Sequence, residues 1–515
     1  MHVKPGADWD EVYARARTAA PEAFDTDRIR NLTNGDWQRS GLAGDHHSPV
    51  DGRTTPGPPR VSPGEASQAV RHALAEHGAW SRVDLDERRG RVVNALDELR
   101  THRDTLALLL VWEIGKPWKS ACADVDRALD GVRWYVQEIE RQLRGRSPLP
   151  GPVSNIASWN YPMSVQVHAE LVQCLAGNAV IAKTPSQGGF HSLTLAHAVM
   201  KRAGLAVTLL SGCGSELGDI LIRSEEIGCL AFVGGRANGR KAATSVADTG
   251  KRHFLEQEGL NTWGVWEYSK WDELAGHMRK GFEYAKQRCT AYPRYVVQRT
   301  LFPQFLQAYL PVLDALEFGH PLAVTSDADE FPDLDYGPLI SAGKAREVEA
   351  AYDEAVAGGG IPLYRGKMTR GRFLDGQDTA AYLPPACVLE PATSWSLHHA
   401  EPFGPLDSIV VVDSEAELLA AMNASNGALV ASVATDDAGF GARVAEELQS
   451  FKVGLNLPRS RGDRDEAFGG KGGAWKGAFV GGDLLVQAVT EGPGPTYGNY
   501  PGYSRYPASI LAASR

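Results

Sequence analysis

The sequence predicts an α/β protein whose core is a doubly wound parallel sheet. Between residues 153 and 257, short apolar segments of strand character alternate with segments of helical periodicity. Each interval between successive strand segments is long enough to hold one helix, as the connection between parallel strands requires. The Pro/Gly-rich segment Ser147–Val153 separates this pattern from the helical segments that precede it.

The chain before that linker divides into an arm and a helical region. Residues 1–60 contain one acidic helical piece near Trp9–Ala20, followed by the turn signal Asn34–Asp36 and several prolines. We therefore expect an irregular, extended arm that lies over the body. From Ser62 the periodicity becomes helical, with Pro63 at a favourable first position. Amphipathic helices are expected at 64–80, 85–112 and 117–143.

The expected domains follow these changes of pattern. The strands predicted for the first domain are Val153–Ala157, Ala179–Lys183, Val207–Leu210, Cys229–Val233 and His253–Glu256. The helices predicted between them are 164–176, 188–203, 214–223 and 236–249. The first domain thus comprises 61–143 and 153–257, and the second comprises 258–480, with strands at Tyr295–Gln298 and Ile409–Val412. Residues 144–152 and 481–515 remain as a linker and a tail rich in Gly, Pro and Tyr.

Composition and charge exclude several classes of protein. Of the 515 residues, 43% are apolar and 23% are charged, so the chain is not disordered, collagenous or coiled-coil. The net charge of −10 does not favour a nucleic acid or an anionic membrane as partner. No apolar run approaches the ~20 residues of a membrane-spanning helix. The six cysteines are scattered, and the N-terminus lacks a signal-peptide pattern. We expect a cytoplasmic protein without disulfides or a bound metal.

Two glycine-rich turns follow predicted strands and open predicted helices. Leu210–Gly218 (LSGCGSELG) and Phe232–Gly239 (FVGGRANG) each allow backbone amides and a helix N-terminus to face a phosphate. Neither turn is a complete GxGxxG fingerprint, and strand-to-helix turns use glycine for structural reasons as well. Taken alone, each turn is interpreted as structural.

A reactive thiol is suggested by Cys289. Arg288 is its neighbour and Arg294 lies five residues further on, and a nearby cation lowers a thiol pKa and increases the fraction of thiolate. The alternative is one buried small apolar residue among six cysteines. Local chemistry alone favours this alternative.

Three polar residues lie at the ends of predicted strands. Glu256 and Glu258 close a central strand, where a buried carboxylate needs either a chemical task or a salt bridge, for which Lys251 and Arg252 are the nearest candidates. Asn160 follows another strand, and its amide either stabilises an oxyanion or belongs to a turn.

The carboxyl ends of parallel strands open onto one crevice, which brings several of these residues together. Asn160, Lys183, Gly234 and Glu256 are all expected at such ends, and Cys289 follows Glu256 by 33 residues. The sequence therefore predicts one site that contains a thiol, a carboxylate and an amide.

Eight short motifs extend this pattern over nearly the whole chain. They are Ser158–Pro162 (SWNYP), Leu175–Lys183 (LAGNAVIAK), Phe232–Gly235 (FVGG), Leu255–Gly259 (LEQEG), Gln287–Cys289 (QRC), Tyr336–Ile340 (YGPLI), Glu401–Pro405 (EPFGP) and Phe468–Lys471 (FGGK). In these motifs, and in their order, the chain resembles the NAD(P)-dependent aldehyde dehydrogenase superfamily. The family motif Gly-Gln-x-Cys is matched at Gln287 and Cys289, but its glycine is absent.

The resemblance implies a Rossmann-like cofactor domain and an α/β catalytic domain at the boundaries given above. It also implies a reduced oligomerisation element formed by the linker and the tail. Members usually carry a β-hairpin before the Trp-Asn motif, which joins the sheet of a partner subunit. Here only Gly145–Ala157 fills that place. We expect a homodimer or another homo-oligomer rather than the usual strand-exchange tetramer.

The resemblance further implies a covalent mechanism. Cys289 attacks an aldehyde to give a thiohemiacetal, and Asn160 with the Cys289 backbone N–H stabilises the oxyanion. Hydride transfer leaves a thioester, and Glu256 deprotonates the water that releases the free carboxylic acid.

NADP or NAD is the implied cofactor. Many NAD-preferring members carry Glu three residues after the ribose-contacting lysine, where this chain has Ser186. Because no carboxylate there repels a 2′-phosphate, and Arg236 lies nearby, we hypothesise that NADP is accepted at least as well as NAD. The residues implied to bind the cofactor are Trp159, Lys183, Ser186, Gly214, Gly218, Gly234, Gly235, Glu401 and Phe403.

The small-molecule aldehyde itself is not identified. Arg288, together with Arg459 and Arg461, either recognises a carboxylate-bearing aldehyde or is solvated or structural. Tyr161 and Phe468 fit an aromatic and a medium-length aliphatic aldehyde equally well. The implied pocket residues are Tyr161, Val165, His168, Arg288, Thr290, the loop Asn456–Asp463 and Phe468.

A second departure from the family pattern concerns Glu258 and Leu260-Asn261, which replace the usual Gly and Lys. A carboxylate at position 258 raises the pKa of Glu256 if both side chains share one face. Two alternative functions are considered: a coenzyme A-acylating dehydrogenase, and a catalytically silent structural relative. Retention of Glu256 argues against the first, and the joint presence of Cys289, Asn160 and Glu256 argues against the second.

Overall fold

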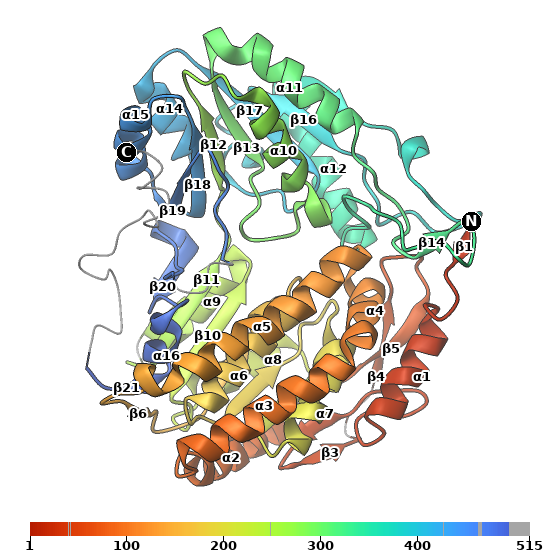
Figure 1. The fold of residues 1–515 in the computed structure, drawn as a ribbon, viewed down its shortest axis with the longest axis vertical. Coiled ribbons are helices and arrows are strands. Elements are labelled where there is room, and N and C mark those ends of the chain that lie inside the picture. Colours follow the sequence, from red (N-terminus) through yellow and green to blue (C-terminus); the bar gives the residue numbers. More distant parts are fainter. Residues whose placement is uncertain (40, 42, 248, 426, 462–465, 494–515) are drawn as a thin grey trace.

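Two large sheets, each covered by helices, form the body of the protein (Figure 1). The computed structural model describes residues 1–515 except 40, 42, 248, 426, 462–465 and 494–515. An eight-stranded sheet lies in the lower half of Figure 1, and a seven-stranded sheet lies in the upper half.

The eight-stranded sheet confirms the predicted doubly wound architecture. Its parallel strands follow the order β11-β10-β7-β8-β9, so the winding direction reverses at β7. Such a reversal opens a crevice at the carboxyl ends of the strands. The strands are β7 (Val153–Ile156), β8 (Val180–Lys183), β9 (Val207–Leu210), β10 (Cys229–Gly234) and β11 (Arg252–Gln257). The intervening helices are the π-helix η1 (Pro162–Val167), α6 (His168–Leu175), α7 (Phe190–Arg202), α8 (Gly214–Arg223) and α9 (Arg236–Ala247).

The N-terminal segment is more regular than the sequence predicts. Helix α1 (Trp9–Ala19) forms as expected, but β2 (Asn31–Thr33) and β3 (Asp36–Gln38) extend the first sheet beyond β9. The prediction of an irregular arm is therefore wrong here. The strands are too short to show a period, and the fully buried Asn31 secures them by donating to the Pro59 carbonyl and accepting from the Ser211 amide. The other N-terminal pairings join β1 (His2–Val3) to β14 (Ala323–Val324), and β4 (Ala43–His47) to β5 (Thr54–Pro59).

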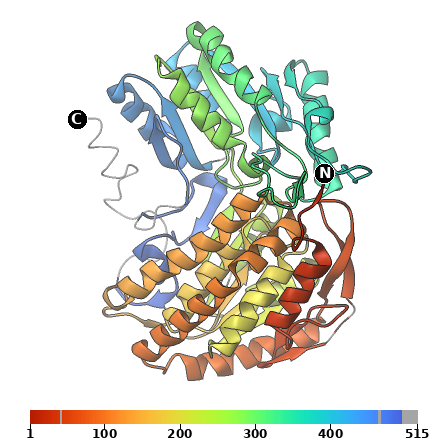
Figure 2. The same ribbon diagram turned by 45° about the vertical axis from the view of Figure 1, so that its right-hand side comes forward.

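Four helices precede the parallel strands in the chain and are drawn in orange in the lower half of Figure 2. The first packs on β8, β9 and α8, and the other three pack on one another and on α6 and α7. Ser62 and Glu65 form a reciprocal capping box at the first of them, with proline at the first helical position. The single helix expected at 85–112 is two helices that meet at His102. The four are α2 (Pro63–Trp80), α3 (Leu85–Thr101), α4 (Arg103–Ile114) and α5 (Trp118–Gln142).

The seven-stranded sheet has the order β15-β16-β17-β13-β12-β18-β19, and β15 alone of these described strands pairs antiparallel. Its strands are β12 (Thr262–Val265), β13 (Arg294–Gln298), β15 (Ile361–Arg365), β16 (Ala386–Leu389), β17 (Leu406–Val412), β18 (Ala428–Ala434) and β19 (Ser450–Leu455). Its helices are α10 (Trp271–Gly281), α11 (Phe302–Asp314), α12 (Ala342–Ala357), α13 (Ser396–His399), α14 (Glu415–Met422) and α15 (Ala438–Glu447). Short 3₁₀ turns occur at η2 (Glu283–Lys286), η3 (Arg299–Leu301), η4 (Met368–Arg370) and η5 (Gly472–Ala474).

The C-terminal part returns from the second sheet to the first. Strand β20 (Trp475–Gly477) pairs antiparallel with β11 and places Trp475 opposite Glu256. After α16 (Asp483–Ala488), strand β21 (Thr490–Glu491) pairs with β6 (Ser147–Pro148), so the linker contacts the start of the tail. Residues 494–515 of the tail lie outside the described residues, and its role in oligomerisation stays a prediction. Among the residues that the structure describes, no helix is both long and apolar enough to cross a membrane.

Candidate active site

The thiol of Cys289 lies between the two sheets, on the turn that joins η2 to β13. The side chain is partly exposed, and Glu256 at the end of β11 lies next to it. Burial raises the pKa of the Cys289 thiol well above its ordinary value, and the charge of Glu256 and its hydrogen bond to the thiol raise this pKa further. These effects favour the neutral thiol over the thiolate in this site.

Arg288 is not the cation that acts on this thiol. Its guanidinium donates to the carbonyl oxygens of Lys280, at 2.9 Å, and Gly281, at 3.2 Å. The cation that lowers the pKa of Cys289, against the stronger effect of burial, is Arg461. The idea that Arg288 lowers the pKa of this thiol, which local chemistry alone did not favour, gains no support from these contacts.

Glu256 is held by a residue far away in the sequence. Its side chain is 2% exposed, and its Oε2 accepts a hydrogen bond from Nη1 of Arg461 at 2.5 Å. The strand-end salt bridge considered from the sequence does not form. Lys251 donates instead to the carbonyl of Ile222 at 2.8 Å, and Arg252 donates to that of Thr490 at 2.8 Å.

Glu258 and Glu256 have different neighbours. Strand β11 ends at Gln257, so the alternation that keeps residues i and i+2 on one face stops before Glu258. A Cβ atom placed on Gly235 would lie 3.4 Å from the Glu258 carboxylate. The charge of Glu258 acts on Glu401, whose pKa it helps to raise.

Two asparagine side chains hold the backbone around the thiol. Nδ2 of Asn160 donates to the Gln287 carbonyl at 3.0 Å. Nδ2 of Asn261 donates to the carbonyls of Cys289 and Ala291, each at 2.7 Å. Asn261 is a positioning residue that the sequence analysis noted only as a departure from the family pattern. Only the fold shows its contact with the thiol-bearing turn.

The turn that leads to Cys289 has an unusual backbone. Tyr284, Ala285 and Lys286 adopt φ values of 56°, 52° and 58°, in the left-handed region that favours glycine. Such residues cost on the order of 1–3 kcal/mol each and persist only when their surroundings hold them. Lys286 stands where the family motif has glycine. Its buried Nζ lies 2.8 Å from Asp407, which also accepts a 2.8 Å hydrogen bond from the Tyr309 hydroxyl.

Glu401 needs hydrogen-bond donors that the described residues do not supply. Both of its carboxylate oxygens are buried and lack a partner within the described part of the chain. Burial raises the pKa of Glu401 well above its ordinary value, and the charge of Glu258 adds to this effect. Near it, the rings of Trp159 and Phe403 meet edge to face at 6.0 Å. A ligand with hydroxyl groups satisfies such a carboxylate, as the ribose of a dinucleotide does.

The other predicted cofactor residues lie at the carboxyl ends of β8, β9 and β10. Lys183 is buried and donates to the Thr184 carbonyl at 2.9 Å, and burial lowers its pKa to about 8. Ser186 is exposed, and nothing lies within 4 Å of a Cβ built on Gly214 or Gly218. Gly234 ends β10, directly before Gly235 and α9. This open edge beside a lysine fits the phosphates and adenosine of NAD(P).

The predicted substrate residues fall into two groups. Tyr161 lies under the buried Lys116, whose Nζ is 3.7 Å from the ring centroid and 2.8 Å from Asp124. The charge of Cys289 acts on Tyr161, which places this ring near the thiol, and burial raises the pKa of Tyr161 to about 12. His168 packs edge to face on Tyr135 at 5.6 Å. Partly exposed positions of the predicted pocket include Val165, His168 and Thr290.

The second group comprises Phe468 and the arginines of the predicted loop Asn456–Asp463. Phe468 is fully buried, and the Arg461 guanidinium lies 5.3 Å from the centroid of its ring. Arg459 is buried and paired with Glu466. Residues 462 and 463 of the predicted loop lie outside the described residues.

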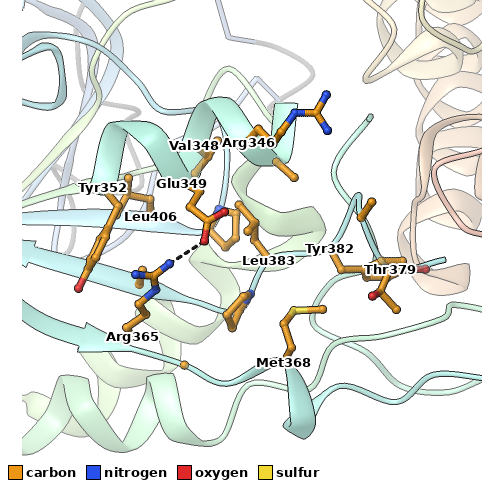
Figure 3. Close-up of a pocket in the computed structure, with 16 residues that line it drawn as sticks. Arg346, Val348, Glu349, Tyr352, Arg365, Met368, Thr379, Tyr382, Leu383 and Leu406 are labelled. Carbon is orange, nitrogen blue, oxygen red and sulfur yellow. Dashed lines mark hydrogen bonds and ion pairs between the residues drawn. The ribbon is translucent and has the colours of Figure 1, made fainter. Parts of the chain in front are cut away.

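A separate pocket of about 340 Å³ lies between α12 and the edge of the second sheet (Figure 3). An ion pair of 2.6 Å between Arg365 and Glu349 crosses it, as the dashed line in Figure 3 shows. None of the predicted site residues lines this pocket, so it is distinct from the site around Cys289.

The fold agrees with the comparisons to known proteins. Residues 37–491 match the Aldehyde dehydrogenase family, and the chain belongs to this family. It is similar to mitochondrial succinate-semialdehyde dehydrogenase of Oryza sativa subsp. japonica, with 25% identity over 450 residues, 83% of this chain and 82% of the relative.

Two solved structures share the fold. NADP-dependent glyceraldehyde-3-phosphate dehydrogenase from Bacillus halodurans, complexed with NADP, has a TM-score of 0.81 and 24% identity, covering 90% of this chain and 98% of its own. Betaine aldehyde dehydrogenase from Staphylococcus aureus, in complex with NAD⁺, has a TM-score of 0.82 and 21% identity, covering 93% of this chain and 96% of its own.

Proposed function

We propose that the protein uses NAD(P) to oxidise an aldehyde to the free carboxylic acid, with Cys289 as nucleophile and Glu256 as base. The observation that carries this proposal is the grouping around the thiol: Asn160 and Asn261 hold the backbone of Gln287 and Cys289, and Glu256 lies close enough for its charge to act on the thiol. The family supplies the reaction class, and these side chains supply the groups that it needs.

The first step is attack by sulfur on the aldehyde carbon. The thiol gives its proton to solvent at this partly exposed position as the C–S bond forms, which leaves Glu256 available as the base for the last step. One N–H of the Asn160 amide is engaged by the Gln287 carbonyl, and the second remains to donate to the oxyanion together with the Cys289 backbone N–H. An oxyanion donor of this kind is worth about 3–4 kcal/mol in other acyl-transfer enzymes.

Bound NAD(P) would supply the acceptor for the hydride that leaves the thiohemiacetal carbon. Glu401 would accept hydrogen bonds from the ribose hydroxyls, which its two unpartnered oxygens need. Trp159 and Phe403 would pack beside the cofactor, and Lys183, which here donates to the Thr184 carbonyl, would hold the adenosine side.

The last step is hydrolysis of the thioester on Cys289. Glu256 accepts a proton from water while the water oxygen bonds to the thioester carbon. The C–S bond then breaks, the thiolate leaves, and the product departs as a carboxylate. A carboxylate base next to the thiol favours water over coenzyme A as the acceptor.

The cofactor preference depends on Ser186. Its exposed side chain carries no charge to repel a 2′-phosphate, so the site accepts NADP at least as well as NAD. Measured kcat/KM values for the two cofactors test this directly. A strong preference for NAD contradicts it.

The decisive test of activity is an aldehyde panel assayed by absorbance of the reduced cofactor, with NAD and NADP in turn. The named relatives suggest succinate semialdehyde, glyceraldehyde-3-phosphate and betaine aldehyde as members of the panel. Addition of coenzyme A separates hydrolysis from acyl transfer, because only an acylating enzyme then forms a thioester product. Absence of reduced cofactor with every aldehyde favours a silent relative.

The protein is further proposed to work in the cytoplasm as a homodimer or other homo-oligomer. The linker strand β6 pairs with β21 within one chain, and only Gly145–Ala157 fills the place of the usual hairpin. Light scattering of the purified protein gives its mass in solution, and a monomer contradicts this proposal.

A further inference from the structure

Three arginines near the thiol are candidates for substrate recognition, and the structure separates them. Arg288 is turned onto the carbonyl oxygens of α10, and Arg459 is buried against Glu466. Arg461 is different. Its side chain is 26% exposed, and its guanidinium lies over the Phe468 ring and ends at Glu256. It is the arginine of the three that faces the reacting groups.

The partner of Arg461 is the group proposed to be the catalytic base. The carboxylate of Glu256 accepts from Arg461 at 2.5 Å and also contacts the Cys289 thiol. A charge-assisted bond of this kind holds the carboxylate in one position and engages Oε2, one of its two oxygens. While the pair persists, this oxygen is not open to a water molecule.

Glu256 also shows which chemistry Arg461 recognises. A carboxylate already sits on the guanidinium, and the same carboxylate acts on the thiol nearby. An aldehyde bonded to sulfur therefore reaches the guanidinium if a short chain of about two to four carbon atoms separates its carbonyl from a carboxylate.

We propose that Arg461 determines specificity by exchanging Glu256 for the carboxylate of a short anionic aldehyde. The exchange does two things at once: it anchors the substrate on a planar guanidinium, and it frees Glu256 to deprotonate water. This inference rests on the proposed function and goes beyond it by naming an anionic substrate class and a coupling between recognition and hydrolysis. A neutral aldehyde leaves the pair intact and is therefore acylated faster than it is released.

The test compares two aldehydes of equal chain length, succinate semialdehyde and butanal, in the wild-type enzyme and Arg461→Gln. In the wild type, kcat/KM is expected to be about 100-fold higher for the anionic aldehyde, within the range of charge-assisted hydrogen bonds. Arg461→Gln lowers this value about 30- to 100-fold, mainly through KM. For butanal the same variant raises kcat, because Glu256 has lost its partner.

Pre-steady-state kinetics provides a second readout. Butanal is expected to give a rapid burst of reduced cofactor and a slow steady state in the wild type, and the burst shrinks in Arg461→Gln. Arg288→Gln is the matched control, since the Arg288 side chain donates to the carbonyls of Lys280 and Gly281. It is expected to change kcat/KM by the same factor for both aldehydes. The inference is overturned if Arg461→Gln lowers kcat/KM by the same factor for both aldehydes, or if the wild type has equal kcat/KM values for the two.

A binding measurement separates this inference from the proposed function. In Cys289→Ala, succinate is expected to raise the unfolding temperature, whereas adding Arg461→Gln abolishes the shift. If no aldehyde is oxidised, the proposed function fails while this binding result still supports an anion site at Arg461. If aldehydes are oxidised but succinate raises the unfolding temperature equally with and without Arg461, the anion site is overturned. The proposed oxidation is then still supported.

Discussion

The two walls of the crevice are built in opposite ways. On one wall, the turn Tyr284–Cys289 holds a strained backbone, and its side chain Lys286 is 1% exposed against an Asp407 that is fully buried. On the other wall, Arg461 is 26% exposed and bonded to Glu256. A fully buried ion pair is costly to separate, whereas a guanidinium that reaches the crevice can exchange one carboxylate for another without being left unpaired.

This difference assigns different tasks to the two walls. The buried pair cannot exchange partners, so it keeps the thiol in one position for every substrate. The pair of Arg461 with Glu256 exchanges when a second carboxylate enters the crevice, so it responds to the substrate. One wall thus holds the thiol in position and the other responds to the substrate, so mutations can disrupt the two tasks independently.

The largest effect is expected from Cys289→Ala. Removal of the nucleophile should lower formation of reduced cofactor by about 10⁴-fold or more, measured by absorbance with the best aldehyde. Unfolding in denaturant is the control and should change little, because the side chain is partly exposed. Oxidation at the wild-type rate would mean that another residue carries the chemistry.

Glu256→Gln is expected to have the next largest effect. The amide cannot accept a proton from water, so steady-state turnover should fall about 10²- to 10⁴-fold. Some thiol acylation and hydride transfer should persist, which rapid-mixing absorbance detects as a single turnover. If neither Glu256→Gln nor Cys289→Ala alters the kinetics, both residues have been wrongly assigned.

The fixed wall is tested by Asp407→Asn. This change leaves Lys286 buried without its charged partner and should cost about 3–5 kcal/mol of unfolding free energy, measured in guanidinium. Asp413→Asn is the matched control, since the pair of Asp413 with Arg299 is exposed on both sides and should not change stability measurably. Equal stability of the two variants would show that the turn is held by other contacts.

The smallest effect is expected at the cofactor end. Ser186→Glu should lower the ratio of kcat/KM for NADP to that for NAD by about 10-fold, because a carboxylate there repels the 2′-phosphate. Ser186→Gln provides a neutral residue of similar size and should leave the ratio close to that of the wild type. An unchanged ratio in Ser186→Glu places the 2′-phosphate elsewhere.

Much of the first domain is predictable from local sequence. Strand β9 and helix α8 form at the predicted residues, because a buried parallel strand and an amphipathic helix each leave a periodic signal. The N-terminal strands were missed since β2 and β3 have only three residues each. Their stability comes from the partner strand and the buried Asn31 rather than from a local pattern.

Around the thiol, the sequence by itself determined which kinds of chemical group are present: a cysteine, a glutamate and an amide, in an order that is typical of one family. Only the tertiary structure decided which cation meets which anion. Arg288 is next to Cys289 in the chain but turns away, while Arg461 and Glu256 are paired across 205 positions. The physical reason is that a side chain's charge is visible in the sequence, whereas its partner depends on how distant segments pack.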